Sequence, residues 1–334
     1  MDKSAILLVG GFGTRLSPLT NLTPKPMLHV GGIPFTEHQI TKARAAGISE
    51  IVLATSYLAD VFEPYFGDGE KFGIKISYAV EKEALGTGGA IANAAKFLKG
   101  QGPVFIFNGD VLSSHDLNAQ LSLHRSEAAD VTLHLTQVED ARAFGVVEMQ
   151  SNAILTFNEK MENPPTNIIN AGCYIFNRDV IDQIPSGRIV SVERETFPEL
   201  LRKGAHLAGY LDSSYWLDIG TPAALLKATS DLISGLAHST AFDDLLEGGL
   251  YQKHHSSLIS SSATIEEGAS IDGGSLIGEG VHIGRSARIV SSVIGAHSRI
   301  GENCQLAHTF VSANNQIPAG FIAASQFFGF SAKK

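Results

Sequence analysis

The chain has 334 residues, of which 44% are hydrophobic and 18% charged, and its net charge is −9. This composition is typical of a globular protein that is long enough for two domains. An acidic chain lacks the basic face that a nucleic acid or an anionic membrane requires, so neither partner is expected and any phosphate site must be local. No apolar run reaches about 18 residues, and the N-terminal one is too short for a secretory signal. Because Cys173 and Cys304 lie in apolar segments without a CxxC partner, we expect buried, reduced thiols and a cytoplasmic location.

Residues 1–232 alternate short β-rich runs with helical periods, and they are predicted to form the first domain. Strands are predicted at 6–9, 51–54, 74–80, 104–107, 131–137 and 174–176, and helices at 34–46 and 89–98. The alternation indicates an α/β fold, a Rossmann-like domain with a mainly parallel sheet that binds its ligands at the carboxyl ends of the strands. The turn-rich segments 66–73 and 161–167 are predicted loops.

Residues 233–257 are predicted to be a connector in which Phe242, Leu245 and Leu246 could form one short amphipathic helix. From 258 to 334 the pattern changes to aliphatic residues at every sixth position, with one slip of a residue after the sixth. They are Ile259, Ile265, Ile271, Ile277, Ile283, Ile289, Ile294, Ile300 and Leu306. A period of six predicts a hexapeptide β-helix with eighteen residues in each triangular coil, glycines 268, 274 and 280 at its turns, and a C-terminal tail.

The first predicted strand runs into a glycine-rich loop. Gly10, Gly11 and Gly13 allow the backbone to approach a ligand closely, so that successive N–H groups can converge on phosphate oxygens. Arg15 adds a planar donor fork, and Lys25, between two prolines, adds a point charge on a stiff backbone. The loop therefore predicts a polyphosphate site.

Spacing excludes two well-known phosphate loops. GxxxxGK[ST] is absent, and GxGxxG fails because Arg15 and Leu16 stand where its last glycine should be. The remaining pattern, GGxGTRLxPLT followed by PKPM, resembles the signature of the sugar-1-phosphate nucleotidyltransferases. The matching positions are Gly10, Gly11, Gly13, Thr14, Arg15, Leu16, Pro18, Leu19, Thr20, Pro24, Lys25 and Pro26.

Two acidic residues follow apolar runs elsewhere in the chain. Asp110 ends the run at 104–109, and Asp218 lies in the sequence YWLDIGTP. A carboxylate at the end of a buried strand needs a cation nearby, and Mg²⁺ requires only a few carboxylate oxygens beside water and phosphate. Each residue alone could be a turn or cap residue. Because the family resemblance covers both, Mg²⁺ bound by Asp110 and Asp218 is the predicted cofactor.

The resemblance also implies a sugar-phosphate site and a base site. In the first, Lys160 would hold the phosphate and Glu159 a hydroxyl, while Gly145, Asn170 and Gly172 would allow a close approach of the sugar. Without the resemblance, Glu159 and Lys160 could be a surface pair on a hairpin. In the second, the turn VEKEALGTGGA would offer backbone donors and room to a nucleotide at Gly86 and Thr87. The carboxylate of Glu81 could accept from both N1–H and the 2-amino group of guanine, which points to GTP.

Within the family, the chain resembles most the bacterial GDP-mannose pyrophosphorylases. The implied reaction converts GTP and mannose 1-phosphate into GDP-mannose and pyrophosphate by in-line displacement, with Arg15, Lys25, Asp110 and Asp218 as the catalytic residues. Three alternatives stay open: a heptose- or glucose-1-phosphate specificity, a noncatalytic regulatory subunit, and a hexapeptide acyltransferase. The faces of a short β-helix usually need covering, so a homo-oligomer formed through this domain is expected.

Overall fold

The computed structural model describes residues 3–11, 13–21, 23–55 and 59–330. The chain divides into two compact units, Met1–Gly11 with Gln39–Trp216, and Phe12–His38 with Leu217–Lys334. The second part of the glycine-rich loop thus belongs to the same unit as the C-terminal residues. The predicted domain bounds at 232 and 258 are based on changes in the sequence pattern. They stay a prediction of which segments fold independently.

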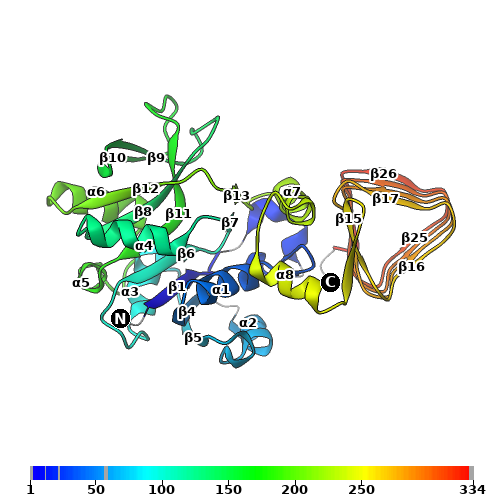
Figure 1. Ribbon diagram of the computed structural model, residues 1–334, viewed down its shortest axis with the longest axis horizontal. Coiled ribbons are helices and arrows are strands. Elements are labelled where there is room, and N and C mark those ends of the chain that lie inside the picture. The colour runs from blue at the N-terminus through cyan, green and yellow to red at the C-terminus, as the bar shows by residue number, and fades with distance from the viewer. Residues whose placement is uncertain (1–2, 12, 22, 56–58, 331–334) are drawn as a thin grey trace. The chain divides into compact units, whose positions relative to one another are not determined.

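A nine-stranded sheet forms the centre of the first unit (Figure 1), with the strand order β5-β4-β1-β6-β11-β8-β12-β10-β9. Its first four strands are parallel, and β11 then joins β6 and β8 antiparallel. The predicted α/β fold is confirmed, and beyond β6 the sheet is mixed. The strands are β1 (Lys3–Leu8), β4 (Ile48–Thr55), β5 (Lys75–Val80), β6 (Val104–Asn108), β8 (Val131–Gln137), β9 (Gly145–Gln150), β10 (Ala153–Glu159), β11 (Ile168–Phe176) and β12 (Leu207–Leu211).

Helices and short strands complete this part of the chain. Of the helices, α1 and α3 confirm the two predicted ones. The N-cap of α4 is Asp116, whose carboxylate accepts from the N–H groups of Asn118 and Ala119. The helices are α1 (Phe35–Ala45), α2 (Ala59–Phe66), α3 (Gly86–Ala95), α4 (Leu117–Ser126), α5 (Arg178–Ile181) and α6 (Phe197–Arg202). Of the short strands, β7 (Val111–Ser113) belongs to the first unit, β2 (His29–Val30) and β3 (Ile33–Pro34) belong to the second, and β13 (Trp216–Asp218) begins in the first and ends in the second.

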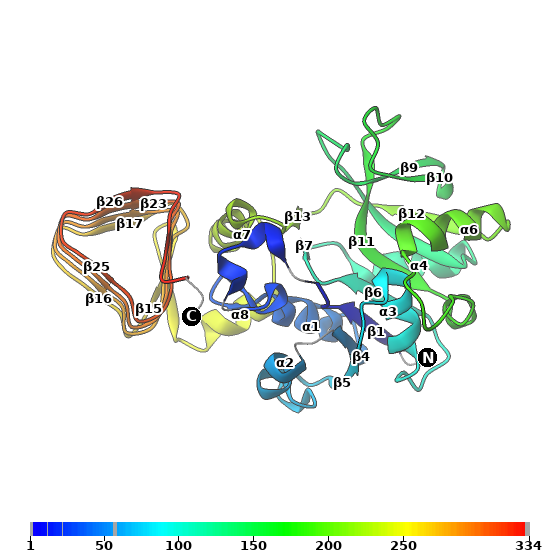
Figure 2. The same ribbon diagram turned by 180° about the vertical axis from the view of Figure 1, so that it is seen from behind.

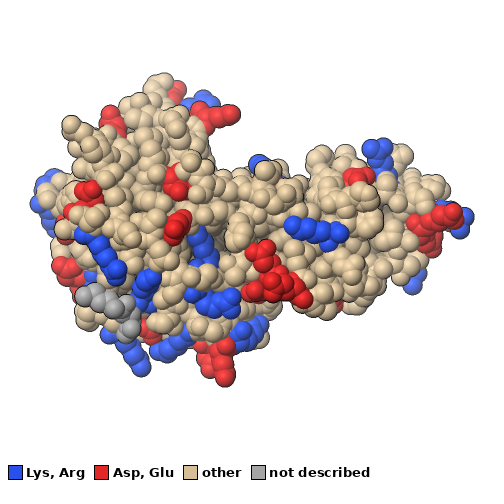
Figure 3. Space-filling model, in the orientation of Figure 1, with Lys and Arg blue, Asp and Glu red and all other residues tan. Residues whose placement is uncertain are grey.

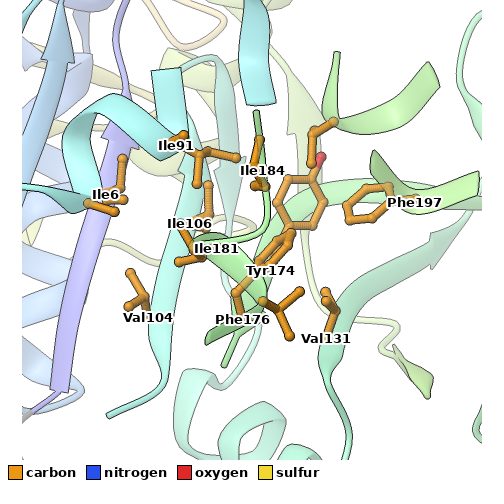
Figure 4. Packing of buried hydrophobic residues seen from close by; sticks show 14 of the residues in the cluster. Ile6, Ile91, Val104, Ile106, Val131, Tyr174, Phe176, Ile181, Ile184 and Phe197 are labelled. Atoms are coloured by element: carbon orange, nitrogen blue, oxygen red, sulfur yellow. The ribbon is translucent and has the colours of Figure 1, made fainter. Parts of the chain in front are cut away.

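The core of the first unit lies between this sheet and its helices. Tyr174 and Phe176 of β11 pack against Phe197 of α6, with ring centroids 5.2 and 6.0 Å apart, and Ile91 of α3 and Ile106 of β6 belong to the same buried cluster (Figure 4). Burial of such side chains stabilises by about 1.5–3 kcal/mol each. The core thereby fixes the strands whose carboxyl ends carry the polar loops.

The second unit contains three 3₁₀ turns, two helices and a β-helix. The turns are Thr14–Leu16, Leu19–Asn21 and Lys25–Met27, and the helices are α7 (Pro222–Ser234) and α8 (Thr240–Glu247). Phe242 of α8 is buried, so the short helix expected in the connector is confirmed. After it, β14 (Tyr251–His254) pairs antiparallel with the first strand of the β-helix.

Three parallel sheets form the hexapeptide β-helix, as Figure 2 shows. Most of the predicted inward positions are buried, whereas Ile265, on an edge strand, is 37% exposed. Glycines 268, 274 and 280 have positive φ, as expected for turns. The strands are β15 (Ser257–Ser260), β16 (Thr264–Ile265), β17 (Ser270–Asp272), β18 (Leu276–Ile277), β19 (His282–Ile283), β20 (Arg288–Val290), β21 (Val293–Ile294), β22 (Arg299–Ile300), β23 (Gln305–Ala307), β24 (Phe310–Val311), β25 (Gln316–Ile317), β26 (Ile322–Ala324) and β27 (Phe327–Phe328).

The predicted coil length of eighteen residues holds only for the first coil. Leu258 pairs with Leu276, eighteen residues on, but Leu276 pairs with Val293 and Val293 with Phe310, which are seventeen residues apart. The slip in the sequence period is therefore a shorter turn that recurs in each later coil.

Both cysteines are buried and free, as predicted. Among the described residues, no helix combines the length and the hydropathy needed to cross a bilayer. On the face shown in Figure 3, basic and acidic side chains are interspersed over the described residues.

Candidate active site

The start of the glycine-rich loop and Asp110 lie at the same edge of the sheet. β1 and β6 are parallel neighbours, so Gly10 and Gly11, which follow β1, lie beside the turn that follows β6. The N–H of Gly109 in that turn donates to the carbonyl of Leu8 at 3.0 Å, and a Cβ on Gly109 would collide with the same carbonyl. The close approach of the two backbones therefore requires glycine at 109. Asp110 lies beside the loop, as expected.

The remainder of the loop folds back on itself within the second unit. Gly13 has a φ of 57°, and a Cβ on it would lie 2.8 Å from Cβ of Lys25. The hydroxyl of Thr20 donates to the Gly13 carbonyl at 3.2 Å. Thr14 is exposed in the turn that follows. Glycine at 13 is thus required for the close packing that places Lys25 against the phosphate loop.

Arg15 and Asp218 both lie close to Gly220. A Cβ on Gly220 would lie 3.0 Å from Nη1 of Arg15 and 3.0 Å from Oδ1 of Asp218. The glycine of the DIGTP motif therefore leaves room for both side chains. Two of the four predicted catalytic residues border the same glycine in this way, although sequence reasoning did not pair them.

The predicted base site follows β5. One carboxylate oxygen of Glu81, Oε2, accepts from the N–H of Leu85 at 3.1 Å and so closes the turn that enters α3. Burial raises the pKa of Glu81, and the hydrogen bond from Leu85 acts in the opposite direction. Glu81 is half-buried and can still accept hydrogen bonds, but one of its oxygens, Oε2, already accepts the bond that closes the turn.

The backbone donors at the start of α3 are less available than the sequence suggested. The N–H groups of Gly88 and Gly89 donate to the carbonyl of Val190 at 2.8 and 3.4 Å, and the N–H of Val190 donates to Leu85 at 2.8 Å. A Cβ on Gly86 would lie 2.6 Å from the same Val190 carbonyl. The glycines of this turn thus also admit the segment around Val190, and the nucleotide contact at Gly86 and Thr87 stays a prediction.

Thr87 ties the same two segments together. Its hydroxyl donates to Oε2 of Glu193 at 2.8 Å and accepts from the N–H of Val192 at 2.8 Å. Because its proton is used, the Thr87 hydroxyl has no donor left for a phosphate oxygen, so donation to a nucleotide phosphate at Thr87 would have to come from the backbone.

Three predicted sugar-phosphate residues lie at one end of the β9–β10 pair. Glu159 is opposite Gly145, and a Cβ on Gly145 would lie 2.7 Å from the Phe157 ring and 3.0 Å from Oε2 of Glu159. Nζ of exposed Lys160 lies 3.7 Å from Oε1 of Glu159. Burial and then the charge of Glu193 raise the pKa of Glu159, while Lys160 lowers it. A carboxylate, an ammonium and a glycine that leaves room for the neighbouring side chains therefore converge here.

Asn170 and Gly172 shape an irregularity in β11. The pairing with β8 shifts between Asn170 and Tyr174, as in a β-bulge. The N–H of Gly172 donates to Oδ1 of Asn170 at 3.0 Å, and Nδ2 of Asn170 donates to the Tyr174 hydroxyl at 2.8 Å. Gly172 has a φ of 75°, and a Cβ on it would lie 3.0 Å from Nδ2 of Asn108. The bulge thus brings Gly172, a predicted sugar contact, next to Asn108, the residue that precedes the Gly109–Asp110 turn.

Sequence reasoning missed Glu193 and Asn108. Glu193 lies in a π-helical turn, Val192–Thr196, of a kind often found at functional sites, and it also accepts from the Ser191 hydroxyl at 3.0 Å. Oδ1 of Asn108 is buried without a hydrogen-bond partner among the described residues. The available signals were a Glu inside VSVERETF and a polar residue that ends an apolar strand.

The donor set suits a hard divalent cation that is completed by substrate. Among the described residues, no three His, Cys, Asp or Glu side chains converge as a complete metal site. Asp110, in the first unit, and Asp218, in the second, each carry hard carboxylate oxygens of the kind that a divalent cation takes together with water and phosphate. Zn²⁺ commonly needs three or four side-chain ligands. A magnesium site that uses both aspartates stays a prediction.

Comparison with known families and proteins agrees with this geometry. The nucleotidyl transferase family matches residues 4–235, and the GlmU-like C-terminal hexapeptide family matches residues 247–325. The chain is 45% identical to mannose-1-phosphate guanylyltransferase of Mycobacterium tuberculosis, over 90% of this chain and 82% of that protein. It is 37% identical to mannose-1-phosphate guanyltransferase of Candida albicans, over 93% and 86% of the two chains.

Solved structures share the fold over about two thirds of this chain. One is a putative glucose-1-phosphate thymidylyltransferase from Bacillus anthracis in complex with a sucrose, with a TM-score of 0.62, 27% identity, and coverage of 68% of this chain and 93% of that one. Another is HddC from Yersinia pseudotuberculosis complexed with GMP-PN, with a TM-score of 0.57, 28% identity, and coverage of 67% and 97%. From its signature loop, its site residues and these matches, the chain belongs to the nucleotidyl transferase family.

Proposed function

We propose that this chain is a mannose-1-phosphate guanylyltransferase, which joins GTP and mannose 1-phosphate to give GDP-mannose and pyrophosphate. The observation that carries the proposal is the 45% identity, over 90% of the chain, to the M. tuberculosis enzyme of that activity. Arg15, Lys25, Asp110 and Asp218 are all present. Their presence argues against a noncatalytic subunit.

The reaction needs positioning and charge neutralisation more than covalent chemistry. A phosphate oxygen of mannose 1-phosphate attacks the α-phosphorus of GTP in line while pyrophosphate leaves, so no covalent intermediate is required. The amides of Gly10, Gly11, Gly13 and Thr14 would hold the leaving β- and γ-phosphates. Backbone donors of this kind are preorganised, and they stabilise charge without rearranging during the reaction.

The four catalytic residues, together with Lys160, would bind the two reacting phosphates and neutralise their charge. Arg15 would bind the leaving phosphates with its donor fork, and Lys25 and Lys160 would neutralise the α-phosphate and the sugar phosphate. Mg²⁺, held by Asp110 and Asp218, would supply further neutralisation when bound.

Recognition of the two substrates would use separate residues. Glu81 would accept from guanine, and Gly86 and Thr87 would line the nucleotide through their backbone. The similarity to HddC, which was solved with a guanine nucleotide, supports a guanine site on this fold. Gly145, Glu159, Lys160, Asn170 and Gly172 would bind mannose 1-phosphate, and their convergence around one carboxylate and one bulge supports this role.

Pyrophosphate release from purified protein tests the proposal. ATP, GTP, CTP, UTP and dTTP would each be offered with mannose, glucose and heptose 1-phosphates in the presence of Mg²⁺. The expected result is the highest kcat/KM for GTP with mannose 1-phosphate. A higher value for another sugar would establish a sibling specificity, and no turnover with any pair would favour a regulatory subunit.

We further propose that the protein is a homo-oligomer that assembles through the hexapeptide domain. The edge strand β16 leaves Ile265 37% exposed, and Ile322 on β26 is 69% exposed, so this domain presents apolar side chains to solvent. Deletion of residues 258–334 should reduce the mass measured by light scattering to that of a smaller assembly. An unchanged assembly state would place the contact in the remaining chain.

A further inference from the structure

One face of α1 holds the backbone on both sides of Asp110. Nε2 of Gln39 donates to the carbonyl of Asn108 at 2.7 Å and to that of Val111 at 3.2 Å. These two carbonyls flank Gly109 and Asp110, so a single side-chain amide bridges the two ends of the turn.

Lys42 extends the same attachment by one helical turn. Residues three apart lie on one face of a helix, so Gln39 and Lys42 project from the same side of α1. Nζ of Lys42 donates to the carbonyl of Ser113 at 2.7 Å and lies 3.0 Å from Nδ1 of His115. Three carbonyls between residues 108 and 113 are thus bound by two side chains of one helix.

The ladder between β1 and β6 does not account for this arrangement. It ends at Asn108, and the N–H of Gly109 then donates to the carbonyl of Leu8. Val111 begins β7, which pairs with β13. The carbonyls of Asn108 and Val111 both accept from Gln39. Buried carbonyls left without donors are costly, so the amide of Gln39 fixes the path of the turn.

We propose that Gln39 is a positioning residue for the Asp110 carboxylate, with Lys42 as a second anchor of the same turn. This inference rests on the proposed function of Asp110 as a metal ligand. A ligand must be held within about 0.5 Å of its productive place, and loss of a residue that orients a ligand typically lowers metal affinity roughly 10- to 100-fold. Gln39 meets neither metal nor substrate in this account; it acts through the turn.

Two variants separate positioning from general stability. Gln39→Met keeps the length of the side chain and removes both hydrogen bonds. The matched control is Asn177→Leu, because Nδ2 of Asn177 also binds backbone: it donates to the carbonyl of Ala129 at 2.9 Å. Asn177 follows Phe176, which pairs with Val104 at the start of β6, whereas Asp110 follows the end of that strand. Both variants lose a side-chain amide that binds backbone, but only one touches the Asp110 turn.

The first measurement uses metal-free protein. Hydrogen–deuterium exchange of the amides at 108–113 should be at least about tenfold faster in Gln39→Met than in the wild type and unchanged in Asn177→Leu, since local protection depends on the bonds that hold the segment.

The second measurement adds metal. Mn²⁺ binding in the presence of GTP should weaken roughly 10- to 100-fold in Gln39→Met alone. In turnover, the Mg²⁺ concentration for half-maximal rate should rise by a similar factor, while KM for mannose 1-phosphate stays within about twofold.

Lys42→Met keeps the proposal testable if Gln39→Met does not fold. Burial lowers the pKa of Lys42 to about 8, so its charge is held at a cost and the methionine variant should remain folded. It should shift exchange and Mn²⁺ binding in the same direction. Equal effects in Asn177→Leu, or unchanged exchange and metal binding in both α1 variants, would overturn the proposal. If Asp110→Asn itself kept normal metal dependence, the proposed function would fail instead.

Discussion

Glycines in two regions of the molecule have different neighbours. At the sheet edge, Gly145 makes room for the Glu159 carboxylate and Gly172 for the Asn108 amide. In the β-helix, a Cβ on Gly284 would lie 2.7 Å from the N atom of Glu302, in the backbone of the next coil. The same residue type thus serves a polar site in one region and coil stacking in the other. The comparison teaches that substitutions at the sheet edge should change activity, whereas those in the coils should change stability.

The largest difference between the regions is expected for acidic residues. Asp110→Asn and Asp218→Asn should each reduce Mg²⁺-dependent turnover to background without unfolding the protein, because one carboxylate leaves the cation underneutralised. Asp272→Asn, on an exposed position of β17, should leave turnover unchanged. Steady-state rates against Mg²⁺ concentration, with thermal unfolding of each variant, make the measurement. Normal metal dependence in either site variant would show that its aspartate is a structural cap.

Lys25→Ala should have the next largest effect. Its charge is expected to matter most as negative charge reorganises during transfer, and loss of one preorganised electrostatic group typically costs about 10² to 10³ in rate. Binding of GTP should change far less than kcat. A variant whose kcat stays within about threefold of wild type would remove Lys25 from the catalytic set.

Glu81→Gln should narrow the preference for GTP. The N–H of Leu85 already donates to one oxygen of Glu81, so a glutamine would keep its oxygen there and turn its NH₂ group toward the base. Opposed donors cost about 1–3 kcal/mol, and uracil, with fewer donors, should be affected less. The ratio of kcat/KM for GTP to that for UTP should fall at least about tenfold. An unchanged ratio would place the base-reading group in the backbone of residues 85–88.

The smallest effects are expected for the glycines themselves. Gly145→Ala should raise KM for mannose 1-phosphate about tenfold, because its methyl group would displace the Glu159 carboxylate and the Phe157 ring. Gly284→Ala should lower the free energy of unfolding by about 1–3 kcal/mol with KM unchanged, because backbone cannot move aside as a side chain can. Urea denaturation and sugar-phosphate kinetics on both variants test the pair. The opposite assignment of effects would remove the distinction between the two regions.

Much of the fold follows from periodicity. The strand predicted at 131–137 is β8 with the same bounds. The six-residue aliphatic period predicted the β-helix because each inward position carries its own aliphatic residue in the sequence. The slip at Ile294 was visible, but its meaning was not. Its recurrence as a seventeen-residue coil depends on pairing between residues far apart in sequence, such as Val293 with Phe310. The antiparallel position of β11 between β6 and β8 is likewise a matter of long-range pairing.

The candidate site was predictable where a motif lies on one short stretch. Gly10, Gly11 and Asp110 could be placed together because parallel strands end at one edge. The position of Arg15 and Asp218 beside the same glycine, Gly220, involves residues about 200 positions apart, so no local pattern could show it. The use of the Gly88 and Gly89 amides by Val190 has the same cause. Such pairings decide which donors are left for a ligand.

The central claim is that this chain selects GTP and mannose 1-phosphate. A single reaction that contains equal concentrations of ATP, GTP, CTP, UTP and dTTP with limiting mannose 1-phosphate and Mg²⁺ tests it most directly, because the nucleotides compete for one site and the product ratio reports the ratio of their kcat/KM values. Separation of the nucleotide sugars should yield GDP-mannose as the dominant product. A dominant UDP-, dTDP- or ADP-mannose would contradict the account.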